Sequence, residues 1–194
     1  MQKTAHHRTP LRTEGFAQPK RAISSLGIQA GFQVADFGSG SGAYTLAIAE
    51  RLEGSGRVYA IDVQRDLLRR TANEAAHRGL KNVEVIWTDL EAPRASKLAD
   101  QSIDLVLISN LLFQLPDKIP ALREARRIVK PGGSVAVIDW SDSFGGLGPV
   151  KEEVVKKEAA LALAGGAGLA LLREFSVGAH HYGLLLRPAY VASV

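Results

Sequence analysis

The sequence predicts an α/β fold: a doubly wound, seven-stranded and mostly parallel sheet with an antiparallel last strand. Short apolar runs alternate five times with longer segments of helical period, which is typical of a parallel sheet covered on both faces. Two further apolar runs joined by a short turn close the chain and predict a final hairpin. Because 194 residues fit one domain with a sizeable core, we expect a single domain over residues 19–194.

The first half of the chain alternates strands and helices that have clear end signals. Pro19 is a good first helical residue and predicts a short helix that ends near Gly27. Gly79 is a suitable C-cap for the helix before it. The expected elements are a strand over 33–37, a helix over 42–52, a strand over 57–62, a helix over 64–78 and a strand over 83–87.

The second half continues the alternation and then ends in the hairpin. The run 103–108 is apolar apart from Asp104, so we expect a central strand that is buried on both faces. Asp117 can cap the next helix, and Pro131-Gly132-Gly133 predicts a turn. The remaining elements are a helix over 117–129, a strand over 134–139, a helix over 151–164, and strands over 169–177 and 181–187.

Composition excludes several classes of protein. The chain has no cysteine, so disulfides, thiolate nucleophiles and Cys-based zinc sites are excluded. No signal-peptide core follows the basic first residues, and the longest nearly apolar run, 159–172, is too short to span a bilayer. We therefore expect a cytoplasmic protein without a membrane span. The net charge of +4 lies in the first 30 residues and predicts a flexible basic arm over 1–18, which more often aids solubility than binds nucleic acid.

The chain is organised around a glycine turn. The run Val34 to Gly42 reads as a buried strand that breaks into three alternate glycines, Gly38, Gly40 and Gly42, and opens onto a helix. Such a turn lets a nucleotide lie against bare main chain, and a side chain at any of the three glycines would obstruct it. The spacing also satisfies the dinucleotide pattern, so it leaves an NAD-binding protein open.

Two acids favour a different nucleotide. Asp62 ends the next apolar run twenty-four residues after Gly38, a distance at which an acid can accept hydrogen bonds from ribose hydroxyls. Asp36 would repel a pyrophosphate, but it can orient the cationic amino end of S-adenosylmethionine. The pattern therefore favours a zwitterionic nucleoside.

With these features the sequence resembles the class I S-adenosylmethionine-dependent methyltransferases, over roughly residues 20–190. The matching segments are Asp36 to Gly42, Ile61-Asp62, Thr88-Asp89-Leu90, Ile103 to Asn110, and Lys130 to Asp139. The resemblance implies a Rossmann-like methyltransferase fold, S-adenosylmethionine as the cofactor and S-adenosylhomocysteine as its product.

The resemblance also implies roles for particular residues. Asp62 would hold both ribose hydroxyls, Asp89 would accept from the adenine amino group, and Leu90 would contact the ring. The backbone of Asn110 would meet the methionine part of the cofactor. The expected cofactor-binding residues are Asp36, Phe37, Gly38, Ser39, Gly40, Gly42, Asp62, Val63, Asp89, Leu90 and Asn110.

Methyl transfer from a sulfonium needs mainly alignment, and a base only where the acceptor arrives protonated. His180 and His181 are the candidate catalytic residues, because histidine has the most suitable pKa for taking a proton near neutrality. Adjacent residues of a strand point to opposite faces, so at most one of them is expected to face the pocket. Tyr182, Asp139 and Asp142 are further candidates at the same edge. The histidine pairs lack a carboxylate at ligand spacing, so no metal is expected.

The acceptor is predicted by exclusion. Strand four is followed by Ser109-Asn110-Leu111-Leu112 instead of the Asn/Asp-Pro-Pro-Tyr element with which relatives hold an amide or exocyclic amine. We expect a small-molecule acceptor methylated at O, N or C, on which Trp140 can stack, as in the similar ubiquinone and menaquinone methyltransferase group. The alternatives are a protein or RNA methyltransferase of the same fold, and an NAD-binding oxidoreductase or non-catalytic nucleoside-binding module. The acceptor's identity and the oligomeric state stay open.

Overall fold

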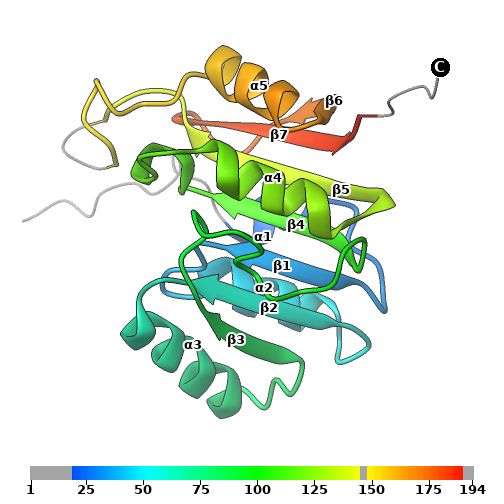
Figure 1. Cartoon of the computed structure of the whole chain (residues 1–194). Helices are drawn as coiled ribbons and strands as arrows, with labels where there is room; N and C mark the ends of the chain where they lie inside the picture. The colour runs from blue at the N-terminus through cyan, green and yellow to red at the C-terminus, as the bar shows by residue number, and fades with distance from the viewer. Residues whose placement is uncertain (1–18, 145–147, 190–194) are drawn as a thin grey trace, which may run out of the picture.

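A computed structural model describes residues 19–144 and 148–189, so the predicted arm over 1–18 lies outside the described residues. Its seven strands form one sheet in the order β3-β2-β1-β4-β5-β7-β6 (Figure 1). Only β7 runs antiparallel to its neighbours, β5 and β6. The strands are β1 (Gln33–Phe37), β2 (Arg57–Asp62), β3 (Val83–Trp87), β4 (Ile103–Ser109), β5 (Val129–Trp140), β6 (Leu169–Phe175) and β7 (His181–Pro188). The predicted fold class is confirmed.

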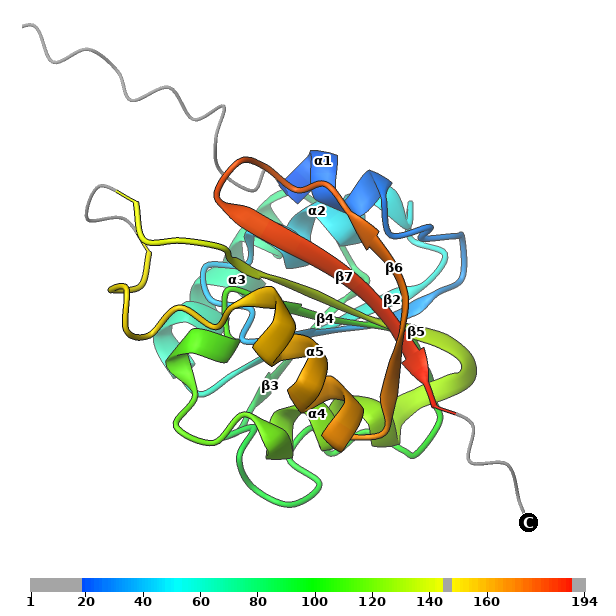
Figure 2. The same cartoon turned by 90° about the horizontal axis from the view of Figure 1, so that it is seen from above.

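Helices cover both faces of this sheet (Figure 2). One face carries α1 (Pro19–Ser24), α2 (Ala43–Arg51) and α3 (Arg65–His77), and the other carries α4 (Ile119–Ile128) and α5 (Lys157–Gly166). The apolar side chains of β1, β4 and β5 alternate between two buried clusters, one beneath each layer of helices. This double burial explains why the central strands read as nearly continuous apolar runs.

The order of the strands reverses between β1 and β4, which are neighbours in the sheet but not in the chain. The glycine turn follows β1, and Asn110 follows β4. Both connections therefore leave the carboxyl edge of the sheet at the reversal point, where ligands of doubly wound sheets bind. The elements β2, β3 and β5 end at the same edge (Figure 1).

Asp104 interrupts the apolar run of β4 and lies near the amino end of that strand. Its Oδ2 accepts the Gln33 backbone N–H at 2.8 Å, and its Oδ1 pairs with Lys130 Nζ at 2.6 Å. The acid thus joins the starts of three neighbouring strands, far from the ligand edge.

The helix predicted over 151–164 begins six residues late, at Lys157. Val155 is buried, and its carbonyl accepts the Tyr182 hydroxyl at 2.9 Å, so the residues just before Lys157 pack against β7 without forming a helix. The preceding helix, α4, begins at Ile119, whose N–H donates to Asp117 Oδ1 at 3.1 Å. Asp117 therefore satisfies a free donor of that helix from just outside it. A short 3-10 helix over Leu112–Gln114, which the sequence did not predict, follows β4.

The connection over 88–102 contains turns in place of a helix. Its path lies beside β3 and α4, and it forms one wall of the pocket considered next. Within residues 19–144 and 148–189, none of the helices has the length and apolar character needed to cross a bilayer.

Candidate functional site

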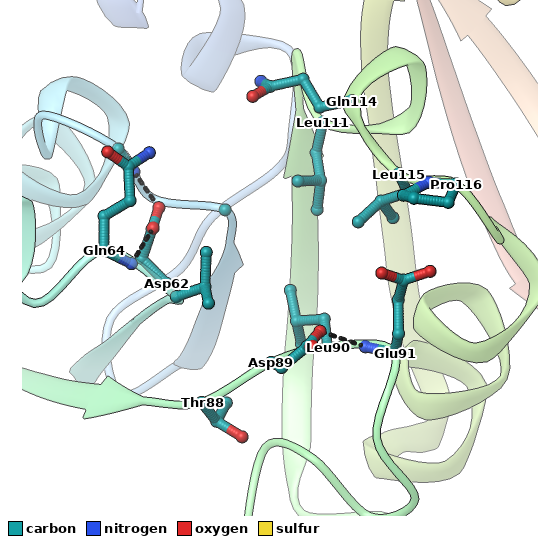
Figure 3. Close-up of a pocket in the computed structure, with 13 residues that line it drawn as sticks. Asp62, Gln64, Thr88, Asp89, Leu90, Glu91, Leu111, Gln114, Leu115 and Pro116 are labelled. Carbon is teal, nitrogen blue, oxygen red and sulfur yellow. Dashed lines mark hydrogen bonds between the residues drawn. The ribbon is translucent and has the colours of Figure 1, made fainter.

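Two adjoining pockets lie at the carboxyl edge of the sheet and share Gly38, Gly40 and Gln114. The first pocket lies between the loops after β2, β3 and β4 (Figure 3). Its other lining residues are Asp62, Val63, Gln64, Thr88, Asp89, Leu90, Glu91, Leu111, Leu115 and Pro116. The second pocket lies on the far side of the glycine turn. Its other lining residues are Pro19, Asp36, Ser39, Ser41, Ala43, Tyr44, Ser109 and Asn110.

Asp62 holds the glycine turn against the loop after β2. Its Oδ2 accepts the Gly40 N–H and its Oδ1 accepts the Gln64 N–H, both at 2.8 Å (Figure 3). Each carboxylate oxygen can accept a further hydrogen bond, and the side chain lines the first pocket. The carboxylate therefore has capacity for two hydroxyl groups without giving up its contacts to the backbone.

The three glycines of the turn have positive φ angles of 68°, 52° and 80°, which explains why side chains are disfavoured there. Their surroundings differ, however. A Cβ on Gly40 would meet only the Gly38 carbonyl oxygen at 3.9 Å, whereas a Cβ on Gly42 would lie 2.5 Å from Thr71 Oγ1 of α3. Gly42 lines neither pocket. Gly42 therefore lets α2 and α3 pack closely, and its contact with a ligand stays a prediction.

The far wall of the first pocket is formed by the segment after β3. Asp89 Oδ1 accepts the Glu91 N–H at 2.9 Å, and Glu91 Oε1 accepts the Asp117 N–H at 3.0 Å. Glu91 thereby joins the loops that follow β3 and β4 across the pocket. Leu90 is buried beside Asp89 and offers an apolar surface to the same space.

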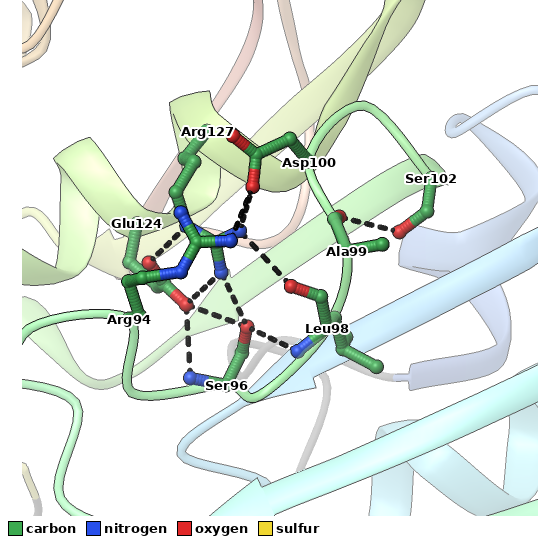
Figure 4. Close-up of polar contacts among 8 residues, drawn as sticks. All are labelled: Arg94, Ser96, Leu98, Ala99, Asp100, Ser102, Glu124 and Arg127. Atoms are coloured by element: carbon green, nitrogen blue, oxygen red, sulfur yellow. Dashed lines mark hydrogen bonds and ion pairs between the residues drawn. The ribbon is translucent and has the colours of Figure 1, made fainter.

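A buried ionic network anchors the rest of that segment to α4 (Figure 4). Glu124 Oε1 accepts the Ser96 N–H at 2.9 Å and the Ser96 hydroxyl at 2.6 Å. Arg127 donates to both oxygens of Glu124, to the Leu98 carbonyl and to Asp100. These contacts fix a connection that has no helix of its own and that carries Asp89 and Leu90.

The second pocket contains polar atoms that lack partners. Within the described ranges, four buried side-chain oxygens that belong to its lining residues accept and donate no hydrogen bond: Ser39 Oγ, Tyr44 Oη, Ser109 Oγ and Asn110 Oδ1. Leaving a buried polar group unpaired costs about 1–3 kcal/mol. A polar ligand in this pocket would supply the missing partners.

Asp36 is the one charged side chain among the lining residues of the second pocket. It is 1% exposed, and its Oδ2 accepts the Thr45 hydroxyl at 2.6 Å. Burial, with a smaller contribution from the nearby Asp62, raises the pKa of this carboxyl to about 7, although the Thr45 hydrogen bond opposes the shift. A cationic ligand group would favour the ionised carboxylate.

Asn110 turns the chain between the two pockets. Its φ is 52°, its N–H donates to the Ile138 carbonyl at 2.8 Å, and its carbonyl accepts Gln114 Nε2 at 2.6 Å. Asparagine tolerates this left-handed conformation better than most residues. The bend directs the following residues, from Leu111 to Pro116, over the mouth of the first pocket.

Of the other predicted cofactor residues, Ser39 and Val63 line a pocket, whereas the Phe37 side chain lies in the core and lines neither. Tyr44, Ser109, Glu91 and Gln114 are lining residues that sequence reasoning missed. A polar Ser109 at the end of an otherwise apolar strand was the available signal. Gln114 gave none, because only the fold brings it to the turn, whereas Tyr44 stands two residues after Gly42 in the sequence.

The candidate bases fall into two groups. Asp139 and Tyr182 hold the fold: Asp139 accepts the Leu112 N–H at 3.0 Å and the Trp140 N–H at 2.8 Å, and the Tyr182 hydroxyl donates to Val155. Burial raises the pKa of Asp139 to about 6 and raises that of Tyr182 as well. These hydrogen bonds tie both side chains to the backbone of neighbouring elements.

The two histidines have different surroundings. His180 Nδ1 lies 3.0 Å from Asp142 Oδ1, and its ring packs 4.0 Å from that of Phe144. His181 is 8% exposed and packs against Trp140, with 4.3 Å between ring centroids. Within the described parts of the chain, no cluster of three or more His, Asp or Glu side chains has the geometry of a metal site.

Comparison with known proteins gives consistent results. Residues 28–175 match a family described as a methyltransferase domain. The crystal structure of a SAM-dependent methyltransferase from Aquifex aeolicus superposes with a TM-score of 0.82 at 29% identity, covering 93% of this chain and 94% of that one.

Two curated proteins are similar over 123 residues, or 63% of this chain. The demethylmenaquinone methyltransferase of Staphylococcus aureus (strain MRSA252) is 31% identical over 48% of its own length. The ubiquinone/menaquinone biosynthesis C-methyltransferase UbiE of Hydrogenovibrio crunogenus is 34% identical over 47% of its length. The chain thus spans about half the length of the curated relatives it matches.

Proposed function

Because this chain belongs to the methyltransferase domain family, as its five motifs predict, we propose that it transfers a methyl group from S-adenosylmethionine to a small planar acceptor. The observation that carries the proposal is the pair of adjoining pockets on either side of the glycine turn. S-adenosylmethionine, the cofactor of this family, has a nucleoside end and a zwitterionic amino-acid end, and the two pockets suit these ends separately.

The first pocket fits the nucleoside. Asp62 would accept hydrogen bonds from the two ribose hydroxyls, and Asp89 would accept one from the adenine amino group. Leu90 and Leu111 would contact the ring from the wall and the mouth of the pocket. Glu91 would keep these walls together through its hydrogen bond to Asp117.

The second pocket fits the amino-acid end. Asp36 would attract the ammonium group, and the hydroxyls of Ser39, Tyr44 and Ser109 would meet the carboxylate or bound water. Burial raises the pKa of Tyr44 to about 12, so its hydroxyl stays protonated and able to donate. Bound S-adenosylmethionine supplies the methyl group and an activated sulfur leaving group. The chain's contribution to an in-line displacement is then to align donor and acceptor.

A quinol-type acceptor is supported by the names of the two curated relatives, which act on demethylmenaquinone or in ubiquinone and menaquinone biosynthesis. Trp140 ends β5 beside the strand that carries Ser109. An indole at this position can stack on a flat ring. A methyl group presented from the second pocket would then face a ring held at the end of β5.

Calorimetric titration of the protein with S-adenosylmethionine, S-adenosylhomocysteine and NAD tests the cofactor. We expect micromolar binding of both sulfur ligands and no binding of NAD.

Asp62→Ala should weaken S-adenosylmethionine binding by about a hundredfold, because two charge-assisted hydrogen bonds are lost. The matched control is Asp66→Ala, an exposed acid four residues along that pairs with Arg69 and lines neither pocket. NAD binding alone would refute the proposal, and equal effects of the two substitutions would refute the assignment of Asp62.

No observation on residues 19–144 and 148–189 favours protein or RNA methylation, since the basic arm that suggested it lies outside them. An NAD-binding oxidoreductase is disfavoured by the buried acid beside the turn, which would repel a pyrophosphate. Acceptor binding that falls steeply with added salt would favour a nucleic acid instead.

A further inference from the structure

A row of side chains leads away from the second pocket across the α2 face of the sheet. Ser109, which lines the pocket, pairs with Ile138 of β5. Trp140 lies two residues further along β5, so its side chain points to the same face. Trp140 pairs with His181 of β7, and the two rings are in contact. His181 therefore lies on the same face of the sheet as Ser109, two strands away from it.

His181 is buried without a hydrogen-bond partner. Its side chain is 92% covered, and neither Nδ1 nor Nε2 has a partner in the described part of the chain. Burial, with a smaller contribution from His180, lowers the pKa of the imidazole to about 4, although Asp142 opposes the shift. The ring is therefore neutral near pH 7, with one donor and one acceptor nitrogen.

The neighbouring polar groups are already engaged. The Tyr182 hydroxyl donates to Val155, the Asp139 carboxylate accepts two backbone N–H groups, and His180 contacts Asp142. Each unpaired nitrogen of a buried imidazole costs about 1–3 kcal/mol. Among these side chains in the described part of the chain, His181 is the buried one whose polar atoms have no hydrogen-bond partner.

We propose that His181 recognises the methyl acceptor: its neutral imidazole hydrogen-bonds to a hydroxyl of a planar aromatic ring that packs against Trp140. This inference rests on the proposed function and names the residue that would select the acceptor. On binding, the acceptor would take the place of neighbouring groups that now cover the His181 imidazole. A neutral imidazole of such low basicity is a weak proton acceptor, so its contribution is to hold and orient the ring.

The test measures acceptor binding to the protein saturated with S-adenosylhomocysteine. The probes are 1,4-naphthohydroquinone, kept reduced, and 1,4-dimethoxynaphthalene, which has the same ring but no hydroxyl. Wild type should bind the hydroquinone about tenfold more tightly than the ether. His181→Phe should remove this preference and leave S-adenosylmethionine affinity within about twofold. Either His181→Asn or His181→Gln should restore part of it, because each amide replaces one ring nitrogen. His77→Gln, an exposed histidine at the end of α3 that lines neither pocket, is the control and should retain the wild-type preference.

A second readout is the ¹⁵N spectrum of the His181 imidazole, which should shift when the hydroquinone is added and not when the ether is added. An unchanged spectrum at saturation, or a His181→Phe protein that keeps the hydroquinone preference, would overturn the inference. If His181→Phe weakens the binding of both probes equally, His181 only supports the fold. If wild type binds S-adenosylmethionine but neither naphthalene, the acceptor class and this inference fail together. Failure to bind S-adenosylmethionine would instead refute the proposed function.

Discussion

At the scale of single residues, the carboxylates of Asp36 and Asp62 are both buried beside the glycine turn but have different environments. Asp62 accepts two backbone N–H groups, whereas Asp36 accepts one hydroxyl and is more deeply covered. Burial raises the pKa of Asp36 in spite of its hydrogen bonds from Thr45, so this carboxyl responds to pH and to a cationic ligand. Asp62 instead offers hydrogen-bonding capacity to the first pocket.

The raised pKa of Asp36 predicts that S-adenosylmethionine binding depends on pH. The free protein holds a proton on Asp36 below a pH of about 7, and the ligand's ammonium group favours the ionised form. Affinity should therefore rise as pH increases through about 7, with release of up to one proton on binding below that pH. Calorimetry in two buffers of different ionisation enthalpy measures this release.

Asp36→Asn should abolish the proton release linked to that residue and flatten the pH dependence of affinity near 7. Thr45→Val, which removes the hydroxyl donor, should move the transition to higher pH, because that hydrogen bond lowers the pKa of Asp36. Proton release that is the same in Asp36→Asn and in wild type would assign the linkage to another group.

At the scale of elements, the turn after β1 serves both the ligand and the packing of helices. Gly40 faces the pockets, whereas Gly42 lies against Thr71 of α3. The third glycine of the pattern thus determines how closely α2 and α3 approach. The same spacing of three glycines therefore contains one position that faces the pockets and one that faces α3.

Gly42→Ala should destabilise the protein by about 2–4 kcal/mol, from a strained φ and a clash with Thr71. Gly79→Ala is the matched control, because Gly79 has a φ of 71° but a Cβ there would meet nothing within 4 Å. It should cost only the conformational part, about 1 kcal/mol. The double variant Gly42→Ala/Thr71→Ala should recover part of the difference in urea unfolding. Equal costs for the two single substitutions would show that the clash has no effect.

The segment over 88–102 depends on α4 for its position, because it has no helix of its own. Glu124 is 5% exposed; burial alone would raise its pKa, but hydrogen bonds from Arg127 and Ser96 outweigh that effect and leave the pKa lowered. A lowered pKa stabilises the folded protein above the unfolded value of 4.5, and this contribution is lost as pH falls through the folded value.

Glu124→Gln should therefore destabilise the protein by about 2 kcal/mol at neutral pH, and by less in acid, because the charge-assisted hydrogen bonds are lost. Since the network supports the segment that carries Asp89, S-adenosylhomocysteine affinity should also fall. Exposed Glu153, on the loop before α5, provides a control whose substitution by Gln should change neither quantity. A loss of stability that is independent of pH would contradict the role assigned to the Glu124 charge.

At the scale of the whole molecule, the order of strands determines which residues can act together. The reversal between β1 and β4 brings the loops after residues 37, 62, 87 and 109 to one edge, although they span more than seventy positions of the sequence. The antiparallel β7 then places His181 beside Trp140, at the end of β5. The groups proposed to bind the cofactor and the acceptor consequently lie on neighbouring strands of the sheet.

Much of this arrangement is readable without coordinates. Alternating apolar runs and helical segments predict the sheet, because local periodicity reflects which faces are buried. Asp62, Asp89 and Asn110 end strands, and parallel strands end at a common edge, so their convergence follows from topology.

Other features could not be predicted from local patterns, because contacts between distant residues determine them. The contact of Val155 with Tyr182 determines where α5 begins. Packing in the sheet buries Phe37, and Thr71 of α3 lies against Gly42. The difference between His180 and His181 is likewise tertiary, since burial against Trp140 arises only when β5 and β7 pair.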